Sequence, residues 1–369
     1  MLQNLPRRGH RAHARARVVV LSCVLVTLLA GCTPALSSPS PSPSPSPSAL
    51  PTRTGYEGHP ITKAAEPGEA PAVTVQPVGR VMSLPEGTHP WGIAVADSVH
   101  SVYLAAHKQN KFVVYDMATG TVTSKAVPGA GRMIDLSVPG GSLLLPAENR
   151  ATLYLLALPS LDVISSESTS TQPHEAVQVG DTTFVTEEYG HAVRALRGGK
   201  TVAHFTQPVQ PGGITAVGNR VAAVDVGANL LFVYDASTLK LIAALPAGEG
   251  PSHVVPIGGT RVAVCDVRGN AVLTYDLAGT PRALGRASVP GRAFWIGSDP
   301  ATGTIYTALS NTNKIAELKV AADGTPTLIT TVPTVRNPIS FDRDSATGDI
   351  YVAGYADSEL QIIPPTAFR

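Results

Sequence analysis

The feature that most constrains the fold is a repeated unit of about forty residues, seen first between Gly87 and Gly120. It contains three short apolar runs, GIAVA, VYLAA and KFVVYD, which are separated by polar turns. Runs of this length, rich in β-branched and aromatic residues and bounded by Gly, Pro, Asn or Asp, predict strands and not helices. A unit of a few strands cannot bury both of its faces alone, so it requires copies of itself.

Copies of this unit fill the rest of the chain. Prolines that introduce an apolar run lie 83, 38, 40 and 87 residues apart, close to multiples of one period: Pro90, Pro173, Pro211, Pro251 and Pro338. The acids that end the third run lie 119 and 41 residues apart: Asp116, Asp235 and Asp276. The second runs align as VYLAA, SLLLPA, TFVTEE, RVAAVD, RVAVCD, IYTALS and IYVAGY, so the chain contains seven units.

A period near forty that is built only from short strands predicts an all-β, seven-bladed β-propeller with four-stranded antiparallel blades. Closure into a ring removes the exposed strand edges that an open sheet of this length would have. The last unit stops one strand short, whereas an additional apolar stretch, GRVMSL, precedes the first unit at residues 79–84. We therefore expect this N-terminal strand to complete the last blade.

The repeat resembles the YVTN family of seven-bladed propellers, in its YncE-like extracytoplasmic branch. The resemblance rests on the second strands Val102–Ala105 and Phe184–Glu187, on PWGIAV from Pro90, and on VYD from Val114 with the following Thr-Gly. It covers residues 75–369 and implies a propeller fold. It does not imply one activity, because members of a fold family differ in function.

The N-terminus has the pattern of an export signal. Residues 1–17 carry five arginines and no acid, and Val18–Leu29 is an apolar run too short to span a membrane. The run ends in Leu29-Ala30-Gly31-Cys32, which resembles the lipobox of bacterial lipoproteins. The resemblance implies that residues 1–31 are removed and that Cys32 is lipidated, which anchors the protein to a bacterial membrane on its extracytoplasmic side. A plain signal peptide is the alternative.

Composition supports an exported, tethered domain. Ser38 to Ser48 alternates Pro and Ser, the pattern of an extended spacer, and we expect residues 32–74 to form a disordered tether before the propeller at 75–369. Without the five signal arginines, the 28 basic residues fall to 23 against 27 acidic ones, a formal charge of −4. This charge predicts no nucleic-acid partner. Cys265 is the single remaining thiol; its strand context predicts a buried, inert side chain.

In a propeller, the turns that lead into the innermost strands and the turns between second and third strands open on one face. We expect this funnel face to bind the ligand or an envelope protein, through His89, His107, His174, Glu175, Glu187, His253 and Arg292. Arg132 and Arg292 replace the proline in two units, and either bind an anion or pair with Glu175 or Glu187. Trp91 and Trp295 either line the funnel or pack between blades.

For two groups of residues on the funnel face, a structural role is the alternative to a binding role. His89, His107, His174, Glu175 and His253 are N/O ligands of the kind that zinc or copper(II) accepts, but no His-x-His or His-x3-His spacing supports a metal site. Hydrogen bonding to neighbouring blades is the favoured interpretation of these residues. Glu187, Asp225 and Asp266 occupy one repeat position in three consecutive units, which favours acceptors for turn amides over an acidic binding arc.

No enzyme motif stands out: the chain has no Gly-x-Ser-x-Gly elbow, no phosphate loop and no His-Glu-x-x-His. The sequence therefore predicts a non-catalytic, membrane-anchored binding or interaction module. A zinc or copper chaperone or sensor is the first alternative, with the divalent metal as its cofactor. A hydrolase or lyase at the same funnel, similar to lactonases, is the second.

Overall fold

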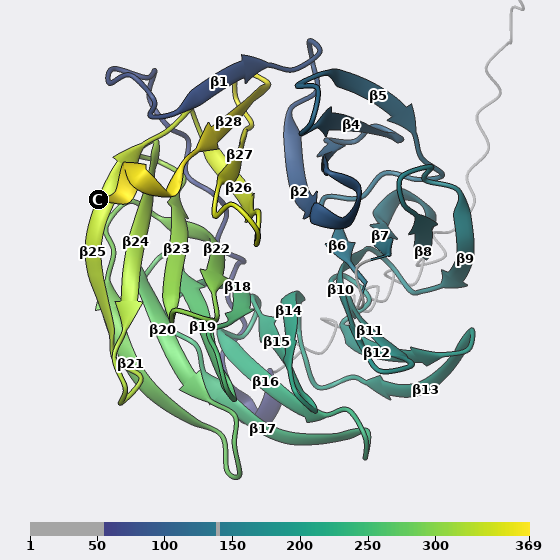
Figure 1. Ribbon diagram of the computed structural model, residues 1–369. Coiled ribbons are helices and arrows are strands. Elements are labelled where there is room, and N and C mark those ends of the chain that lie inside the picture. The colour runs from purple at the N-terminus through teal and green to yellow at the C-terminus, as the bar shows by residue number, and fades with distance from the viewer. Residues whose placement is uncertain (1–54, 138–140) are drawn as a thin grey trace, which may run out of the picture. The chain divides into compact units, whose positions relative to one another are not determined.

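The computed structural model describes residues 55–137 and 141–369. Their strands form seven four-stranded antiparallel sheets arranged as blades around a ring (Figure 1). The predicted seven-bladed β-propeller is therefore confirmed.

The strands of the first four blades follow the chain from the inside of the ring outward. Blade 1 contains β2 (Pro90–Ala96), β3 (Ser101–Ala106), β4 (Lys111–Asp116) and β5 (Val122–Ala126). Blade 2 contains β6 (Asp135–Leu136), β7 (Ser142–Ala147), β8 (Thr152–Ala157) and β9 (Val163–Ser168). Blade 3 contains β10 (Pro173–Val179), β11 (Thr182–Glu187), β12 (Ala192–Arg197) and β13 (Lys200–Phe205). Blade 4 contains β14 (Pro211–Val217), β15 (Arg220–Asp225), β16 (Leu230–Asp235) and β17 (Lys240–Pro246).

The remaining three blades complete the ring. Blade 5 contains β18 (Pro251–Pro256), β19 (Arg261–Asp266), β20 (Ala271–Asp276) and β21 (Arg282–Ser288). Blade 6 contains β22 (Ala293–Asp299), β23 (Thr304–Leu309), β24 (Lys314–Val320) and β25 (Pro326–Pro333). Blade 7 contains β26 (Pro338–Arg343), β27 (Ile350–Gly354), β28 (Glu359–Ile363) and β1 (Arg80–Ser83). Short 3-10 turns are η1 (Tyr56–Gly58), η2 (Asp97–Val99), η3 (Glu148–Arg150) and η4 (Pro365–Phe368).

The ring is closed by a strand from each end of the propeller. β1 pairs antiparallel with β28, and Val81 lies opposite Gln361 in this register. The prediction that residues 79–84 complete the last blade is therefore confirmed. The Gln361 amide, fully buried, adds a bond from its Nε2 to the Val78 carbonyl at 2.7 Å, which holds the chain where it enters β1.

Each blade packs its two faces against the blades on either side. Between blades 3 and 4, for example, Phe184 and Val193 pack with Phe232 in one buried cluster. Between blades 7 and 1, Leu360 packs with Leu104 in another. Burial of whole strands in this way is the main favourable term for such a fold, at roughly 25 cal/mol per Å² of apolar surface. The predicted burial of Cys265 is also observed, and burial raises the pKa of its thiol to about 11.

Residues 55–79 pack against the propeller, although residues up to 74 were expected to belong to a disordered tether. This segment crosses the ring, and Figure 1 shows it as the purple chain that leads into β1. It lies against the blades: the Thr62 amide donates to the Gly227 carbonyl at 2.6 Å, and Tyr56 packs edge-on against Phe232 at 5.3 Å between centroids. The sequence could not show the Thr62 bond because both of its partners are backbone groups, which any residue provides.

The export signal, Cys32 and the Pro-Ser spacer lie outside the described residues. Within residues 55–137 and 141–369, no helix has the length and apolar character needed to cross a membrane.

The closing strand gives a test of the ring. Gly79 has a left-handed backbone (φ +73°), and a Cβ there would clash with the Ile362 carbonyl oxygen of β28. We expect Gly79→Ala to lower the free energy of unfolding by about 2–4 kcal/mol, because steric overlap adds to backbone strain. Thermal unfolding of the two proteins, followed by circular dichroism, measures the difference.

Gly180→Ala is the matched control for this substitution. Gly180 is also left-handed (φ +60°), but a Cβ there would meet no atom within 4 Å. Gly180→Ala should lower the free energy of unfolding only by the backbone strain, about 1 kcal/mol. Equal losses in the two variants would contradict a special role of Gly79 in ring closure.

Candidate functional site

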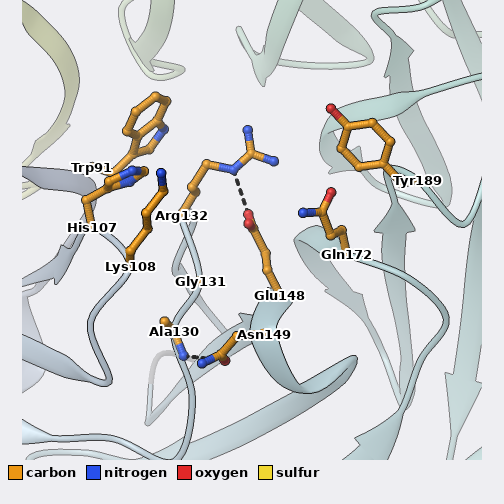
Figure 2. A pocket seen from close by; sticks show the side chains of 10 residues that line it. All are labelled: Trp91, His107, Lys108, Ala130, Gly131, Arg132, Glu148, Asn149, Gln172 and Tyr189. Carbon is orange, nitrogen blue, oxygen red and sulfur yellow. Dashed lines mark hydrogen bonds and ion pairs between the residues drawn. The ribbon is translucent and has the colours of Figure 1, made fainter. Parts of the chain in front are cut away.

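A pocket of about 510 Å³ lies on the funnel face over the turns of blades 1, 2 and 3. It brings together residues from both kinds of turn named in the sequence analysis. Figure 2 shows its lining: Trp91, His107, Lys108, Ala130, Gly131, Arg132, Glu148, Asn149, Gln172 and Tyr189.

The innermost strands present side chains to this face through a recurrent bulge. Each of β10, β14 and β18 begins with a proline, which has no amide to donate and is tolerated at the first position of a strand. The pairing with the second strand then shifts, between Pro173 and Ala176 in blade 3 and between Pro251 and Val254 in blade 5. A bulge re-aims the residues that it contains. In these two blades the bulged residues include His174 and His253.

One wall of the pocket is aromatic. The Trp91 and His107 rings are stacked with centroids 5.0 Å apart, and Tyr355 meets both rings edge-on, at 5.3 and 5.7 Å. Burial lowers the pKa of His107, and the nearby charges of Lys108 and Arg132 lower it further, so the imidazole is neutral at pH 7. Trp91 Nε1 and His107 Nδ1 are buried and have no hydrogen-bond partner among the described residues.

The base of the pocket is a charged network. Arg132 Nε donates to Glu148 Oε1 at 2.7 Å, and Arg132 Nη2 donates to Glu188. Gln210 Nε2 donates to the second oxygen of Glu188 at 2.9 Å. Burial alone would lower the pKa of Arg132, but the two carboxylates outweigh it and raise the pKa. The Arg132 guanidinium is therefore held in place as a structural cation.

His174 extends this network toward the channel. Its Nδ1 lies 3.7 Å from Glu148 Oε1 and 3.8 Å from Glu188 Oε2, too far for a hydrogen bond but close enough for an ion pair when the ring is protonated. Burial alone would raise the pKa of Glu148, but His174 and Arg132 together lower it to about 2. Burial likewise opposes the charge of Glu188, and His174 and Arg132 lower its pKa.

His253 lies beside His174, with ring centroids 6.4 Å apart and Trp295 at 4.3 Å on another side. Its Nδ1 faces the Phe294 carbonyl at 3.0 Å. Burial lowers the pKa of His253 to about 3, so the ring is neutral. Because a carbonyl only accepts, the proton lies on Nδ1 and Nε2 carries a lone pair. That Nε2 is buried and has no partner in the described part of the chain.

Three acids on the innermost strands lie deeper in the ring and bond to the next blade. Glu175 Oε2 accepts from the Ile214 amide at 2.7 Å, and Asp342 Oδ2 accepts from the Val95 amide at 2.7 Å. Asp135 Oδ2 accepts from the Ala176 amide at 3.3 Å. Burial raises all three pKa values: well above 4.5 for Glu175, to about 7 for Asp135 and to about 6 for Asp342.

The structure gathers only some of the residues chosen from the sequence. His107 lines the pocket, His174 lies in the network beneath it, and His253 adjoins His174. His89 is exposed and bonds through Nδ1 to the Tyr355 carbonyl at 2.9 Å, and Glu175 lies deeper in the ring. The remaining two, Glu187 and Arg292, lie elsewhere.

Glu187 and Arg292 have separate surroundings. Glu187 is fully buried and pairs with Arg194 of its own blade, Nε to Oε1 at 2.6 Å. Arg292 lines a separate depression, which residues 62–66 form together with Glu249 and Arg268. The expected pairing of Arg132 with Glu175 or Glu187 is not observed, because Glu148 and Glu188 stand closer to the guanidinium.

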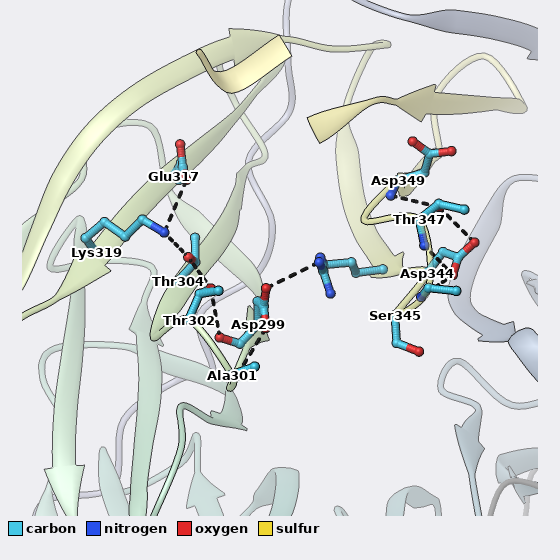
Figure 3. A network of polar contacts seen from close by, with 12 residues as sticks. Asp299, Ala301, Thr302, Thr304, Glu317, Lys319, Asp344, Ser345, Thr347 and Asp349 are labelled. Carbon is cyan, nitrogen blue, oxygen red and sulfur yellow. Dashed lines mark hydrogen bonds and ion pairs between the residues drawn. The ribbon is translucent and has the colours of Figure 1, made fainter. Parts of the chain in front are cut away.

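The acids that recur at one position of the repeat accept hydrogen bonds from the backbone amides of nearby turns. Asp225 Oδ1 accepts from the Gln210, Gly227 and Ala228 amides at 2.9 to 3.1 Å. Asp266 accepts in the same way from the Gly250 amide at 2.8 Å. Figure 3 shows a comparable network at the turns of blades 6 and 7, where Asp344 accepts from the Thr347 amide at 3.2 Å.

Arg132 was considered from the sequence but not chosen for the site, and Lys108 and Gln172 were missed. The two missed residues lie in turns, outside any motif, and they differ from unit to unit. Each belongs to the pocket only because three blades place their turns side by side.

Within the described ranges, no group of three or more His, Cys, Asp or Glu side chains is placed so that it could hold a metal ion. His89, His107, His174, Glu175 and His253 are therefore not gathered into one coordination site. His174 and His253 come nearest to each other, and the acids beside His174 are already occupied by Arg132.

Comparison with known proteins shows the fold and no more. No family model and no curated protein matches the chain. Among solved structures, the RRP9 WD40 repeats match with a TM-score of 0.69 and 11% identity, over 80% of this chain and 99% of that one. Hydrazine synthase from Kuenenia stuttgartiensis matches at 0.65 and 14%, over 76% and 97%. Virginiamycin B lyase from Staphylococcus aureus matches at 0.64 and 16%, over 77% and 97%.

The charged network can be tested through stability. Arg132→Met would leave the Glu148 and Glu188 carboxylates largely buried without their cation, and we expect a loss of about 2–4 kcal/mol at pH 7. The lowered pKa of Glu148 means that its contribution is present above about 4.5 and is lost as the pH falls through about 2. The difference between variant and wild type should therefore shrink in acid. Urea unfolding at pH 7 and pH 3 measures it.

Arg282→Met is the control for this measurement, because Arg282 forms a salt bridge with Asp276 at 3.0 Å but its side chain is 61% exposed. It should change the free energy of unfolding by about 0.5 kcal/mol or less. A similar small effect for Arg132→Met would show that the network does not stabilise the fold.

For the three deep acids we expect a pH dependence of stability opposite to that of Glu148. The pKa of Asp135 is raised from 3.8 to about 7, so its contribution is full below 3.8 and is lost as the pH rises through about 7. Asp135→Asn removes this ionisation. We expect the variant to have a higher thermal midpoint than wild type at pH 8, by about 2 °C or more, and a smaller change between pH 5 and pH 8.

Asp181→Asn provides the comparison for the Asp135 variant, since the Asp181 side chain is 76% exposed. It should leave the pH dependence of the midpoint as in wild type. If Asp135→Asn does the same, Asp135 is ionised in the folded protein throughout this range.

Proposed function

We propose that this protein is a non-catalytic binding module of the bacterial envelope, which takes a small ligand in the pocket over blades 1 to 3. The proposal includes a lipid anchor at Cys32, export across the membrane and membership in the YVTN, YncE-like propellers. The lipobox pattern, the Pro-Ser spacer and the repeat residues quoted above support these parts.

The aromatic wall beside an unpaired cation carries the proposal. Trp91 and His107 offer a flat stacked surface of the kind that binds planar rings. Lys108 is exposed at the rim and has no ion-pair partner among the described residues, whereas Arg132 is neutralised by two carboxylates. The pocket therefore suits a planar ligand with an anionic oxygen.

Binding is favoured over catalysis because His253 is not tuned as a general base. A general base works best with a pKa near the operating pH, but burial lowers the pKa of His253 to about 3. The likeness to virginiamycin B lyase keeps a lyase, or a related hydrolase, as the second candidate. Cleavage of quinupristin, a compound bound to that lyase in one solved structure, would favour it if His253→Ala abolished the cleavage.

The metal chaperone or sensor is the weaker alternative on this geometry. A zinc or copper site would need a third ligand beside His174 and His253, and within the described ranges no such group exists. One metal ion per chain, lost on His174→Ala together with His253→Ala, would overturn that ranking.

The binding test compares two probes of the same shape. Indole-3-carboxylate and its neutral amide, indole-3-carboxamide, both offer a planar ring, but only the first carries a charge. We expect the carboxylate to bind the full chain about 3–10-fold more tightly at pH 7, the effect of one exposed ion pair. Calorimetric titration measures both affinities.

Lys108→Met should remove this preference and leave the affinity for the amide unchanged. Lys200→Met, at an exposed lysine of β13, should keep the preference. Equal binding of the two probes to wild type, or an unchanged preference in Lys108→Met, would contradict the proposed anion contact.

A further inference from the structure

The segment from Thr62 to Ala72 covers a second cavity next to the pocket. This chamber has a volume of only about 30 Å³, space for about one water molecule. Ala64, Ala65 and Glu66 form one side of it, and His174, Ser252 and His253 form another. Trp91 and Arg132 line both the chamber and the larger pocket, so the two spaces share a wall.

The segment is held across the ring mainly through its backbone. Side chains of the blades donate to its carbonyls: Arg268 Nη1 to Lys63 at 2.7 Å, Asn337 Nδ2 to Gly68 at 2.7 Å, Asn313 Nδ2 to Pro71 at 3.0 Å and Arg336 Nε to Ala70 at 3.1 Å. The Gly68 amide donates to Ser310 Oγ at 2.8 Å. These bonds come from several blades, so the segment lies on the face as an extended peptide would.

Few apolar side chains anchor this segment. Its buried residues are Ala65, Gly68 and Ala70, which together contribute two methyl groups. Ala65 packs in a cluster with Phe294 and Ile339, against which Trp91 and Trp295 also lie. Elements with little buried apolar surface and many bonds near solvent open well below the energy of global unfolding.

The chamber contains a polar atom that calls for a ligand group. His253 is 4% exposed, and its Nε2 is an acceptor without a partner in the described part of the chain. The Nδ1 of His174, which also lines the chamber, is likewise buried and has no hydrogen-bond partner in the residues described. Buried polar atoms are almost always paired, so these atoms require a partner that the described residues do not supply.

We propose that Thr62–Ala72 is a displaceable strap, and that its displacement opens the His253 chamber beside the pocket over blades 1 to 3. A ligand with a hydroxyl or amide N–H then reaches His253 Nε2 as a hydrogen-bond donor. This extension rests on the proposed binding function, because it describes access to the same site. The strap itself is a property of the protein without any ligand.

The test loosens the strap without touching the chamber. A Cβ at Gly68 would lie 2.5 Å from Asn311 Cβ and 2.8 Å from Arg292 Cδ, so Gly68→Val should push the strap away from blade 6. Ala72→Val introduces the same side chain at an exposed strap residue and is the matched control. Arg336→Met, which removes the bond to the Ala70 carbonyl, is a second loosening variant.

Two readouts are made on the full chain in mild detergent. Lys63 is the one tryptic site between Arg53 and Arg80, so cleavage after Lys63 reports an open strap. Diethyl pyrocarbonate modification of His174 and His253, located by mass spectrometry, reports access to the chamber, with the exposed His100 as reference. We expect both rates to rise about tenfold in Gly68→Val and Arg336→Met, and to stay at the wild-type level in Ala72→Val.

Thermal unfolding checks that the blades of each variant remain folded. Faster cleavage at Lys63 with unchanged modification of both histidines would show that the strap does not cover the chamber. Cleavage at the wild-type rate in both loosening variants would show that the strap is not a separately opening element. Neither readout uses a ligand, so the strap can be confirmed even if the indole probes do not bind. Binding of the indole probes can likewise be confirmed even if the strap does not open.

Discussion

Burial of each blade's two faces against its neighbours is the constraint on which the rest of the structure depends. A four-stranded blade has two apolar faces and no helix to cover either one, so only a closed ring buries them all. The interface between blades 7 and 1 therefore matters as much as those between sequential blades, although its partners, such as Leu360 and Leu104, lie at opposite ends of the chain. The pairing of β1 with β28 secures that interface by backbone bonds.

Ring closure also decides which residues meet at the centre. The fold, the number of blades and the closing strand could be predicted because they follow from the period of the repeat, which the sequence displays directly. The candidate site could be predicted only in part. The repeat position shows which end of a strand a residue occupies, but it does not show which way the side chain points. Glu187 and Glu188 illustrate the difference: adjacent in sequence, one pairs with Arg194 inside its blade and the other with Arg132 at the pocket.

The strap was beyond prediction for a different reason. Its sequence, KAAEPGEAPA from Lys63 to Ala72, has the small residues and prolines of a linker, and composition alone favours continuing the tether through it. What orders it is the set of donors that the ring presents, including Asn337 and Arg268. These donors become neighbours only after the blades have closed. A segment can thus be linker-like in sequence and ordered in structure when its partners are long-range side chains.

The placement of the two central histidines depends on residues without side chains in blade 4. At its bulge, where blades 3 and 5 carry His174 and His253, it has Gly212 and Gly213. A Cβ on Gly213 would lie 2.8 Å from His253 Cα and 3.2 Å from Glu175 Oε2. The glycines therefore let the inner strand of blade 4 pack closely against the inner strands of blades 3 and 5. The close placement of the two histidines, 6.4 Å between ring centroids, depends on this missing side chain as much as on the histidines themselves.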